Sequence, residues 1–388
     1  RDLRTGLEYI RSSRKIEDEG FHIILDAYQC HVFYDFREIK DDDKGFLAAL
    51  ESSLGGGGTE NISRDLKKVR FAAIFRPFSR LLRPRAVRRL FDRPPRPAEN
   101  GEPDADIAAL LPDLEAFIKE ARRLRGRKNP EAPLPAGGLA LIETVVRLVP
   151  SDVSPTWVSS RYSRPALKYL FARIPVLPDR ALSVYRVFYA WSLLEAMGRG
   201  IAGKKEREDP SVWLKKWFLE DAIGTFFREL GVDSGRVNEE LSLISILLRY
   251  RDRLMKIKTK NHLFLIEPLF RDSEVRSFLL YHWHNNILWF NRERFQELLY
   301  WLTASAALIR SSAIRRKEGK LRVRGMVLCR AARRLTELAE KSGYRVGDFR
   351  RMLAEEPRKR RRTKTRRTKG RGTKGRRRKG RGNPIKAS

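Results

Sequence analysis

Apolar residues recur at intervals of three and four positions through most of residues 105–356, and this spacing constrains the fold more than any other feature. Residues spaced in this way share one face of an α-helix, and that face must pack against another element. We therefore predict an all-α helical domain over 105–356. The stripes comprise Leu110, Leu114, Phe117, Ala121 and Leu124; Val184, Val187, Phe188 and Trp191; Val237, Leu241, Ile244 and Leu248; and Phe295, Leu298, Leu299 and Leu302.

Several helix boundaries can be predicted from capping residues. Asp179 precedes one stripe, and Asp209 stands immediately before Pro210, which is the order of an N-cap and a first-turn proline. Gly231 and Gly343 follow helical segments at the position where a left-handed residue ends a helix.

Residues 21–39 are the exception to this helical pattern. Aromatic and β-branched side chains alternate with polar ones from Tyr28 to Phe36, which is typical of a half-buried strand. Two strands alone are marginally stable, so this segment must pack on something else. We predict a mainly α fold in which residues 1–44 form a β-hairpin or the remnant of a β-sandwich.

Residues 45–104 connect these two parts. Phe46–Leu54 is predicted to be a short helix that the Gly55–Gly58 run ends. The stretch 64–96 holds twelve Lys or Arg and two acids, its helical pattern is broken by Pro77 and Pro84, and a Pro-rich linker follows. Two interpretations remain open: a surface helix that meets a polyanion, or a packing helix whose Arg stems cover apolar surface.

The last part of the chain, 357–388, is predicted to be a disordered basic tail. From Arg358 onward there are seventeen Lys or Arg and no acid, in a formal net charge of +34 for the whole chain. Without large apolar side chains it cannot bury enough area to offset the entropy of ordering. We expect non-specific polyanion binding here. The candidate residues are Arg358, Lys359, Arg360, Arg361, Arg362, Arg366, Arg367, Arg376, Arg377 and Arg378.

Composition limits the remaining classes. Hydrophobic residues make up 41% of the chain, which supports a core, and the two cysteines do not indicate a disulfide framework. A reducing compartment fits, and no run of about 18 apolar residues predicts a membrane span. We expect a cytoplasmic protein. Because the chain begins at Arg1 without Met, we also expect a fragment of a longer protein.

No cofactor or metal site is predicted. His282 and His284 would share a face in a strand, but two ligands do not make a site and no further ligand stands at suitable spacing. Asp41, Asp42 and Asp43 lack the spaced oxygens and closing Glu of a calcium loop, so they indicate a turn. No nucleophile elbow or Cys–His pair is present, and we expect no catalytic residue in this chain.

Aromatic residues are dense between positions 281 and 301. Such a run could stack sugar rings or bases, although aromatic stripes at helical spacing usually belong to a core. Trp289, Phe290 and Trp301 are the candidate polymer contacts.

Two segments resemble a known family. Leu25–Ile39, followed by Leu50–Gly58, is similar to the region after the catalytic barrel in large α-amylase-family glycoside hydrolases. Ser273–Leu302, and above all Ile287–Leu299, resembles their C-terminal helical extension. The resemblance implies that this chain is a non-catalytic C-terminal portion, that its partners are an α-glucan or the missing barrel, and that the barrel lies before Arg1.

The family's catalytic carboxylates have no counterpart in the chain. Glycosyl transfer requires two suitably separated carboxylates, and Asp348 in Gly343–Asp348 stands one residue too late for the family's nucleophile motif. The alternative function is that of a nucleic-acid-associated helical protein, which would bind RNA or DNA through the basic tail and the stretch 64–96.

Overall fold

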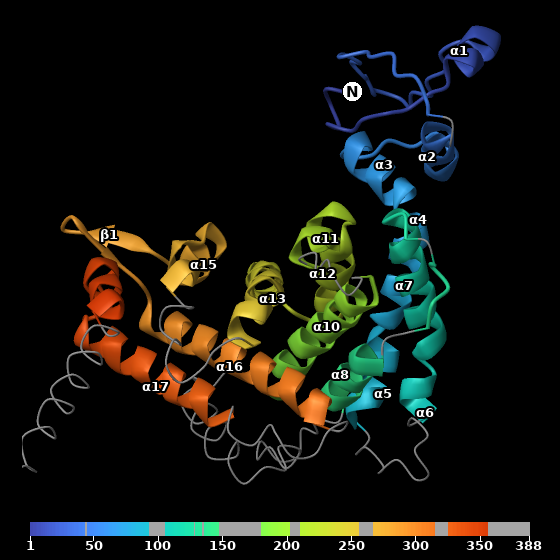
Figure 1. Cartoon of the computed structure of the whole chain (residues 1–388). Coiled ribbons are helices and arrows are strands. Elements are labelled where there is room, and N and C mark those ends of the chain that lie inside the picture. The colour runs from blue at the N-terminus through green and yellow to red at the C-terminus, as the bar shows by residue number, and fades with distance from the viewer. Residues whose placement is uncertain are drawn as a thin grey trace, which may run out of the picture.

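The computed structural model describes residues 1–42, 45–92, 105–127, 129–133, 136–146, 180–201, 210–255, 267–314 and 325–355. These residues form a mainly helical protein, which confirms the predicted fold class (Figure 1). The polyanion-binding residues proposed for the tail, from Arg358 to Arg378, lie outside the described residues, as do Asp179 and Asp209.

The helices follow one another along the chain with short connections. Their bounds are α1 Ser13–Glu19, α2 Phe46–Leu54, α3 Ile62–Arg70, α4 Ala72–Leu81, α5 Pro84–Asp92, α6 Ala105–Ala108, α7 Leu111–Leu124, α8 Ala136–Val146, α10 Arg180–Ile201, α11 Pro210–Lys216, α12 Leu219–Glu229, α13 Ser234–Met255, α15 Ser273–Phe278, α16 Arg292–Ile314 and α17 Gly325–Lys341, with a 3-10 turn at Glu267–Arg271 and a last helical segment at 346–355.

The helical body is built around α10. Every residue of α10 from Tyr185 to Met197 is buried, because α7, α8, α11 and α13 pack around it. At its centre the rings of Phe188 and Trp301 lie 4.8 Å apart, which joins α10 to α16. Helices buried on all sides are apolar all round rather than amphipathic, and this explains why no single stripe describes α10.

The remaining helices form two arms (Figure 1). Helices α4 and α7 pack together in one arm, and the N-terminal part of the chain stands beyond its end. Helices α16 and α17 run side by side along the other arm. None of the described helices is both long enough and apolar enough to cross a membrane.

The predicted proline breaks are correct at one position and wrong at the other. Pro84 begins α5, where its missing N–H is not needed. Pro77 lies inside α4 and does not end it. The carbonyl that loses its partner belongs to the exposed Ala73, where water can replace the missing hydrogen bond. The chain breaks instead at Phe71, between α3 and α4.

One antiparallel sheet occurs among the described residues, and it lies far from the predicted position. Its strands are β1 His282–His284 and β2 Ile287–Trp289, in the register His282↔Trp289, Trp283↔Leu288 and His284↔Ile287. Residues 21–39 instead form an extended path with one isolated bridge, Asp2↔Phe33. The strand pattern there lacks a neighbouring ladder in which to pair its backbone groups.

Candidate functional site

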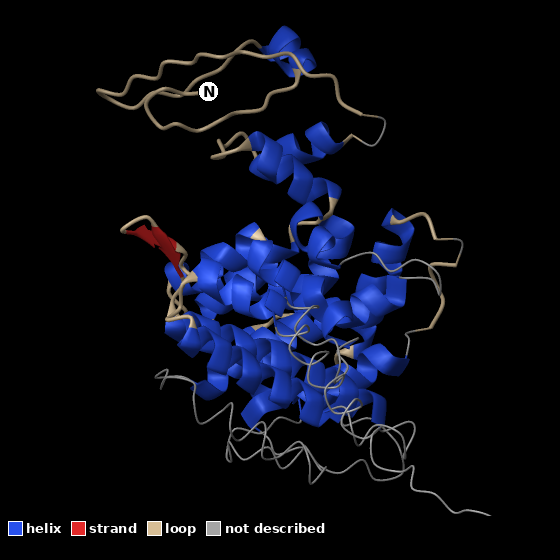
Figure 2. Cartoon of the chain, turned by 60° about the vertical axis from the view of Figure 1, so that its left-hand side comes forward, coloured by secondary structure: helices blue, strands red, loops and turns tan. Residues whose placement is uncertain are grey.

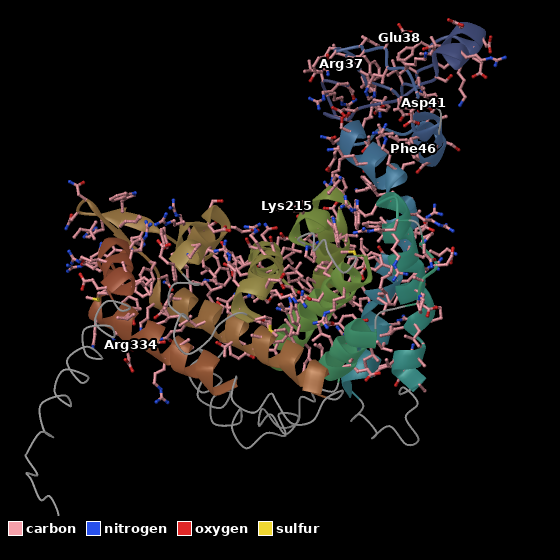
Figure 3. The ribbon with its side chains drawn as sticks, in the orientation of Figure 1. Arg37, Glu38, Asp41, Phe46, Lys215 and Arg334 are labelled. Carbon is pink, nitrogen blue, oxygen red and sulfur yellow. The ribbon has the colours of Figure 1, made fainter. Side chains whose placement is uncertain are left out.

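A polar pocket of about 390 Å³ lies among α3, α11, α12, α13 and α15. Its wall includes the cations Arg64, Lys215 and Arg228 and the acids Glu220, Asp221 and Glu274. Lys215, labelled in Figure 3, belongs to α11. This volume falls within the usual range for a small-molecule site.

The charges in the pocket wall largely pair with one another. Arg64 Nη2 lies 3.1 Å from Asp221 Oδ2, and Lys215 Nζ lies 4.0 Å from Glu274 Oε1. Glu274 also accepts hydrogen bonds from Arg249 Nη2 at 2.7 Å and from Ser245 Oγ at 3.0 Å. The pocket therefore presents hydrogen-bonding groups without a strong net charge.

Glu220 is the one carboxyl of this wall whose pKa is raised. Burial raises the pKa of Glu220, and the nearby carboxylates of Asp221 and Glu274 add to this effect against the opposing charge of Lys215. No hydrogen bond to its carboxyl occurs among the described residues. A carboxyl in this environment can exchange a proton nearer neutral pH than an exposed one.

A second candidate surface lies on the N-terminal part of the chain. Tyr28 is 106% exposed and Ile24 is 91% exposed. We define the N-terminal apolar surface as the large apolar side chains exposed between residues 21 and 39: Phe21, Ile23, Ile24, Leu25, Tyr28, Val32, Tyr34, Phe36 and Ile39. Contiguous exposed apolar side chains of this number mark an interaction surface in a folded protein.

Polar contacts hold the N-terminal part in shape beneath that surface. The buried Asp2 carboxylate accepts hydrogen bonds from Thr5 Oγ1 at 2.6 Å and from His31 Nδ1 at 2.8 Å. The Thr5 hydroxyl, followed by His31, holds the pKa of Asp2 well below its usual range, against the effect of burial. Asp41 accepts from the backbone N–H of Leu47 and Ala48, so it belongs to the start of α2 (Figure 3).

The candidate polymer contacts lie in different environments. Phe290 is 3% exposed and Trp301 is 2% exposed, so both rings belong to the core and cannot be presented to a polymer in this structure. Trp289 is half-buried, with the Arg345 guanidinium 5.2 Å from its ring centre. The most exposed tryptophan among the described residues is Trp283 on β1, at 72%. Sequence reasoning missed its position because it did not recognise the hairpin.

The basic stretch 64–96 divides into two groups of cations. Arg64, Lys68, Arg70 and Arg80 form ion pairs with Asp221, Asp65, Asp42 and Asp113 respectively. Five further arginines on α4, α5 and the turn between them are exposed and form no ion pair with another described residue. We call these the arginine ridge: Arg76, Arg83, Arg85, Arg88 and Arg89. Both interpretations of the stretch thus have a physical basis, because the buried Phe78 also packs into the core.

His282 and His284 share one face of β1 and are both exposed. Among the residues that the structure describes, no group of three or more His, Cys, Asp or Glu side chains could hold a metal ion. The Gly55–Gly58 run ends α2, with Gly55 in the left-handed conformation at φ 54°.

No protein-family model, curated protein or solved structure matches this chain.

Proposed function

We propose that the chain is a non-catalytic C-terminal portion of an α-amylase-like glycoside hydrolase that acts on α-glucan in the cytoplasm. In this proposal the N-terminal apolar surface packs against the catalytic barrel, and the helical body braces the assembly. The observation that carries the proposal is the exposure of that surface on a segment whose sequence resembles the region after the barrel in this family.

The energetics of the surface support a covering partner. Each fully exposed aliphatic or aromatic side chain that becomes buried contributes about 1.5–3 kcal/mol. The N-terminal apolar surface contains nine such side chains, and Ile24, Tyr28 and Phe36 are the most exposed of them. A stable interface requires an apolar centre of this kind, surrounded by polar residues. Arg37, which pairs with Asp35, and Glu38 lie in this part of the chain (Figure 3).

The backbone of the same segment also supports a partner. Its alternating pattern is that of a strand, yet within the described residues it carries isolated backbone contacts, such as Tyr34 N–H to Arg1 O and Leu3 N–H to Val32 O. An adjacent strand from a partner would pair the remaining N–H and C=O groups, as in β-strand addition. The brace of a barrel supplies such strands.

The first test is the coding sequence that precedes the Arg1 codon. We expect it to encode a (β/α)-barrel that carries two aspartates and one glutamate at the ends of its strands. An upstream sequence without such a barrel would overturn the proposal.

A biochemical test uses the complete enzyme. Ile24→Asp and Phe36→Asp together should weaken the contact between barrel and N-terminal surface, and thereby lower the thermal stability of the barrel. Leu124→Asp is the matched control, because Leu124 is 45% exposed on α7 and lies outside this surface. The chain alone should release no reducing ends from starch. Hydrolysis that depends on the chain's own carboxylates would contradict a non-catalytic role.

The arginine ridge favours a second function, the binding of RNA or DNA. Each cation that neutralises a phosphate contributes a slope of about −0.9 to the logarithm of affinity against the logarithm of salt concentration. Deleting 358–388 should abolish binding if the tail alone acts as a polycation. Retained, sequence-selective binding by the truncated chain, lost in Arg85→Glu with Arg88→Glu, would favour this function over the first.

A further inference from the structure

The hairpin of β1 and β2 lies in a stretch of the sequence without charge. The fifteen residues from Ser277 to Asn291 include no Asp, Glu, Lys or Arg, although 34% of the whole chain is charged. At the average density about five charged residues would fall in a stretch of this length. Surface segments normally carry charge for solubility, so a neutral, aromatic surface segment needs a separate explanation.

The geometry of the hairpin is fixed at both ends. Asn285 and Asn286 form its turn with φ of 48° and 57°, the left-handed pair that a type I′ turn requires. At the base, Phe290 N–H donates to Tyr344 O at 3.1 Å, and the backbone of Trp289 bridges that of Arg345. Figure 2 shows the hairpin standing off the helical body. Its outer residues are therefore held in place without being covered.

Trp283 lies on this held and uncovered part. Alternation along β1 places its indole on the same face as Leu288, its cross-strand partner, whereas His282 and His284 lie on the opposite face. The indole is 72% exposed, and the turn amides of Asn285 and Asn286 are the nearest polar side chains along the chain. A flat apolar ring beside neutral amides complements a ligand that has an apolar C–H face and hydroxyl groups.

We propose that this hairpin binds a neutral carbohydrate chain, with a pyranose ring stacked on Trp283 and its hydroxyls hydrogen-bonded by Asn285 and Asn286. The proposal rests on the proposed function where it takes α-glucan as that carbohydrate. A single-stranded nucleic acid would also stack on an indole, but it requires cations along its backbone. The absence of Lys and Arg from Ser277–Asn291 favours the neutral ligand.

The test measures binding of maltoheptaose and soluble amylose to the full chain by calorimetry and by affinity gel electrophoresis. Trp283→Ala should weaken binding about tenfold, the effect of one lost aromatic contact. Trp283→Phe should recover part of the affinity. His284→Ala is the matched control, because it removes a ring of the same strand from the opposite face, and its affinity should stay within about threefold of the original.

Three outcomes would overturn the inference. The first is that the unaltered chain fails to bind either glucan. The second is that Trp283→Ala binds as well as the original chain while its circular dichroism and melting temperature are unchanged. The third is that an oligo(dT) probe binds in a Trp283-dependent manner and glucans do not, which would identify a base-stacking surface.

These results separate from those that test the proposed function. A barrel encoded before Arg1 together with Trp283-independent glucan binding would leave the proposed function intact and remove this site. Trp283-dependent binding of glucan without an upstream barrel would keep the site and remove the proposed function.

Discussion

Arg186 on α10 and Glu240 on α13 form a bidentate salt bridge in the interior, with Nε 2.7 Å from Oε2 and Nη2 2.6 Å from Oε1. Both side chains are almost completely buried. Glu240 also accepts from Arg236, which continues to Glu297 on α16. The three central helices are thus connected by charge as well as by apolar packing, and each partner compensates for the desolvation of the next.

Glu240→Ala should therefore destabilise the protein strongly. It leaves the buried Arg186 guanidinium without its carboxylate, and breaking one side of a buried pair typically costs about 3–5 kcal/mol. Urea denaturation followed by circular dichroism measures the loss. The control is Arg334→Ala on α17 (Figure 3), whose pair with Glu337 is partly exposed, so a loss of no more than about 1 kcal/mol is expected. Equal losses in the two variants would contradict the assigned role of burial.

Acid should destabilise the contact between α13 and α15 through Asp272. Burial opposes ionisation of Asp272, but hydrogen bonds from Arg249 at 2.7 Å and Tyr250 at 2.9 Å outweigh it and lower the pKa below its usual 3.8. A lowered pKa gives stability that is present above the unfolded value and is lost as pH falls from about 4 through the folded pKa.

Asp272→Asn tests this assignment. Asn can still cap α15, as Asp272 does by accepting from the N–H groups of Glu274 and Val275. The variant should lose stability at pH 7 and show a flatter decline of melting temperature between pH 5 and 3 than the original protein. An unchanged acid decline would show that Asp272 is not responsible.

Gly138→Ala should destabilise the packing of α8 on α10. A Cβ at Gly138 would lie 3.0 Å from the Cβ and 3.1 Å from the Cα of Ala196, and a backbone atom cannot move aside cheaply. Overpacking of this kind typically costs about 1–3 kcal/mol, more than the roughly 1 kcal/mol that Ala gains in helix propensity. Chemical denaturation measures the difference. A more stable variant would show that the two helices can separate slightly.

Replacing the exposed side chains of the N-terminal apolar surface should leave the stability of the isolated chain almost unchanged. Ile24→Ser and Tyr28→Ser remove groups that contact mostly water, so each should change the free energy of unfolding by no more than about 0.5 kcal/mol. Both should reduce the fluorescence of a bound apolar dye. Phe78→Ser, a change of a fully buried ring, is the contrasting control and should destabilise the protein strongly.

Local signals in the sequence predicted much of the helical body. The helices bounded by Pro210 and Gly231 begin and end as expected, because a first-turn proline and a left-handed glycine act through their own backbone. Asn291 likewise accepts a hydrogen bond from Arg294 N–H at 2.9 Å, at the start of α16. Features of this kind depend on neighbours in sequence, so the sequence reveals them.

Other features depend on distant residues and could not be predicted. The pocket joins Arg64, Glu220 and Glu274, which no spacing rule brings together. Residues 28–36 show the alternation of a strand, yet no ladder forms, because pairing requires a neighbour that the described residues do not provide. The β1–β2 hairpin carried a local signal, since Asn285 and Asn286 separate two alternating segments, but each strand is only three residues long.

The complete burial of α10 has a consequence for synthesis of the chain. Translation passes from the end of α10 at Ile201 to the end of α13 at Met255, which takes roughly 3–11 s at about 5–20 residues per second. During that interval the face of α10 that α13 later covers remains open to solvent in the nascent chain. We expect a trigger-factor-type chaperone to engage the ribosome-bound polypeptide at this point, and to leave once α13 has emerged and packed.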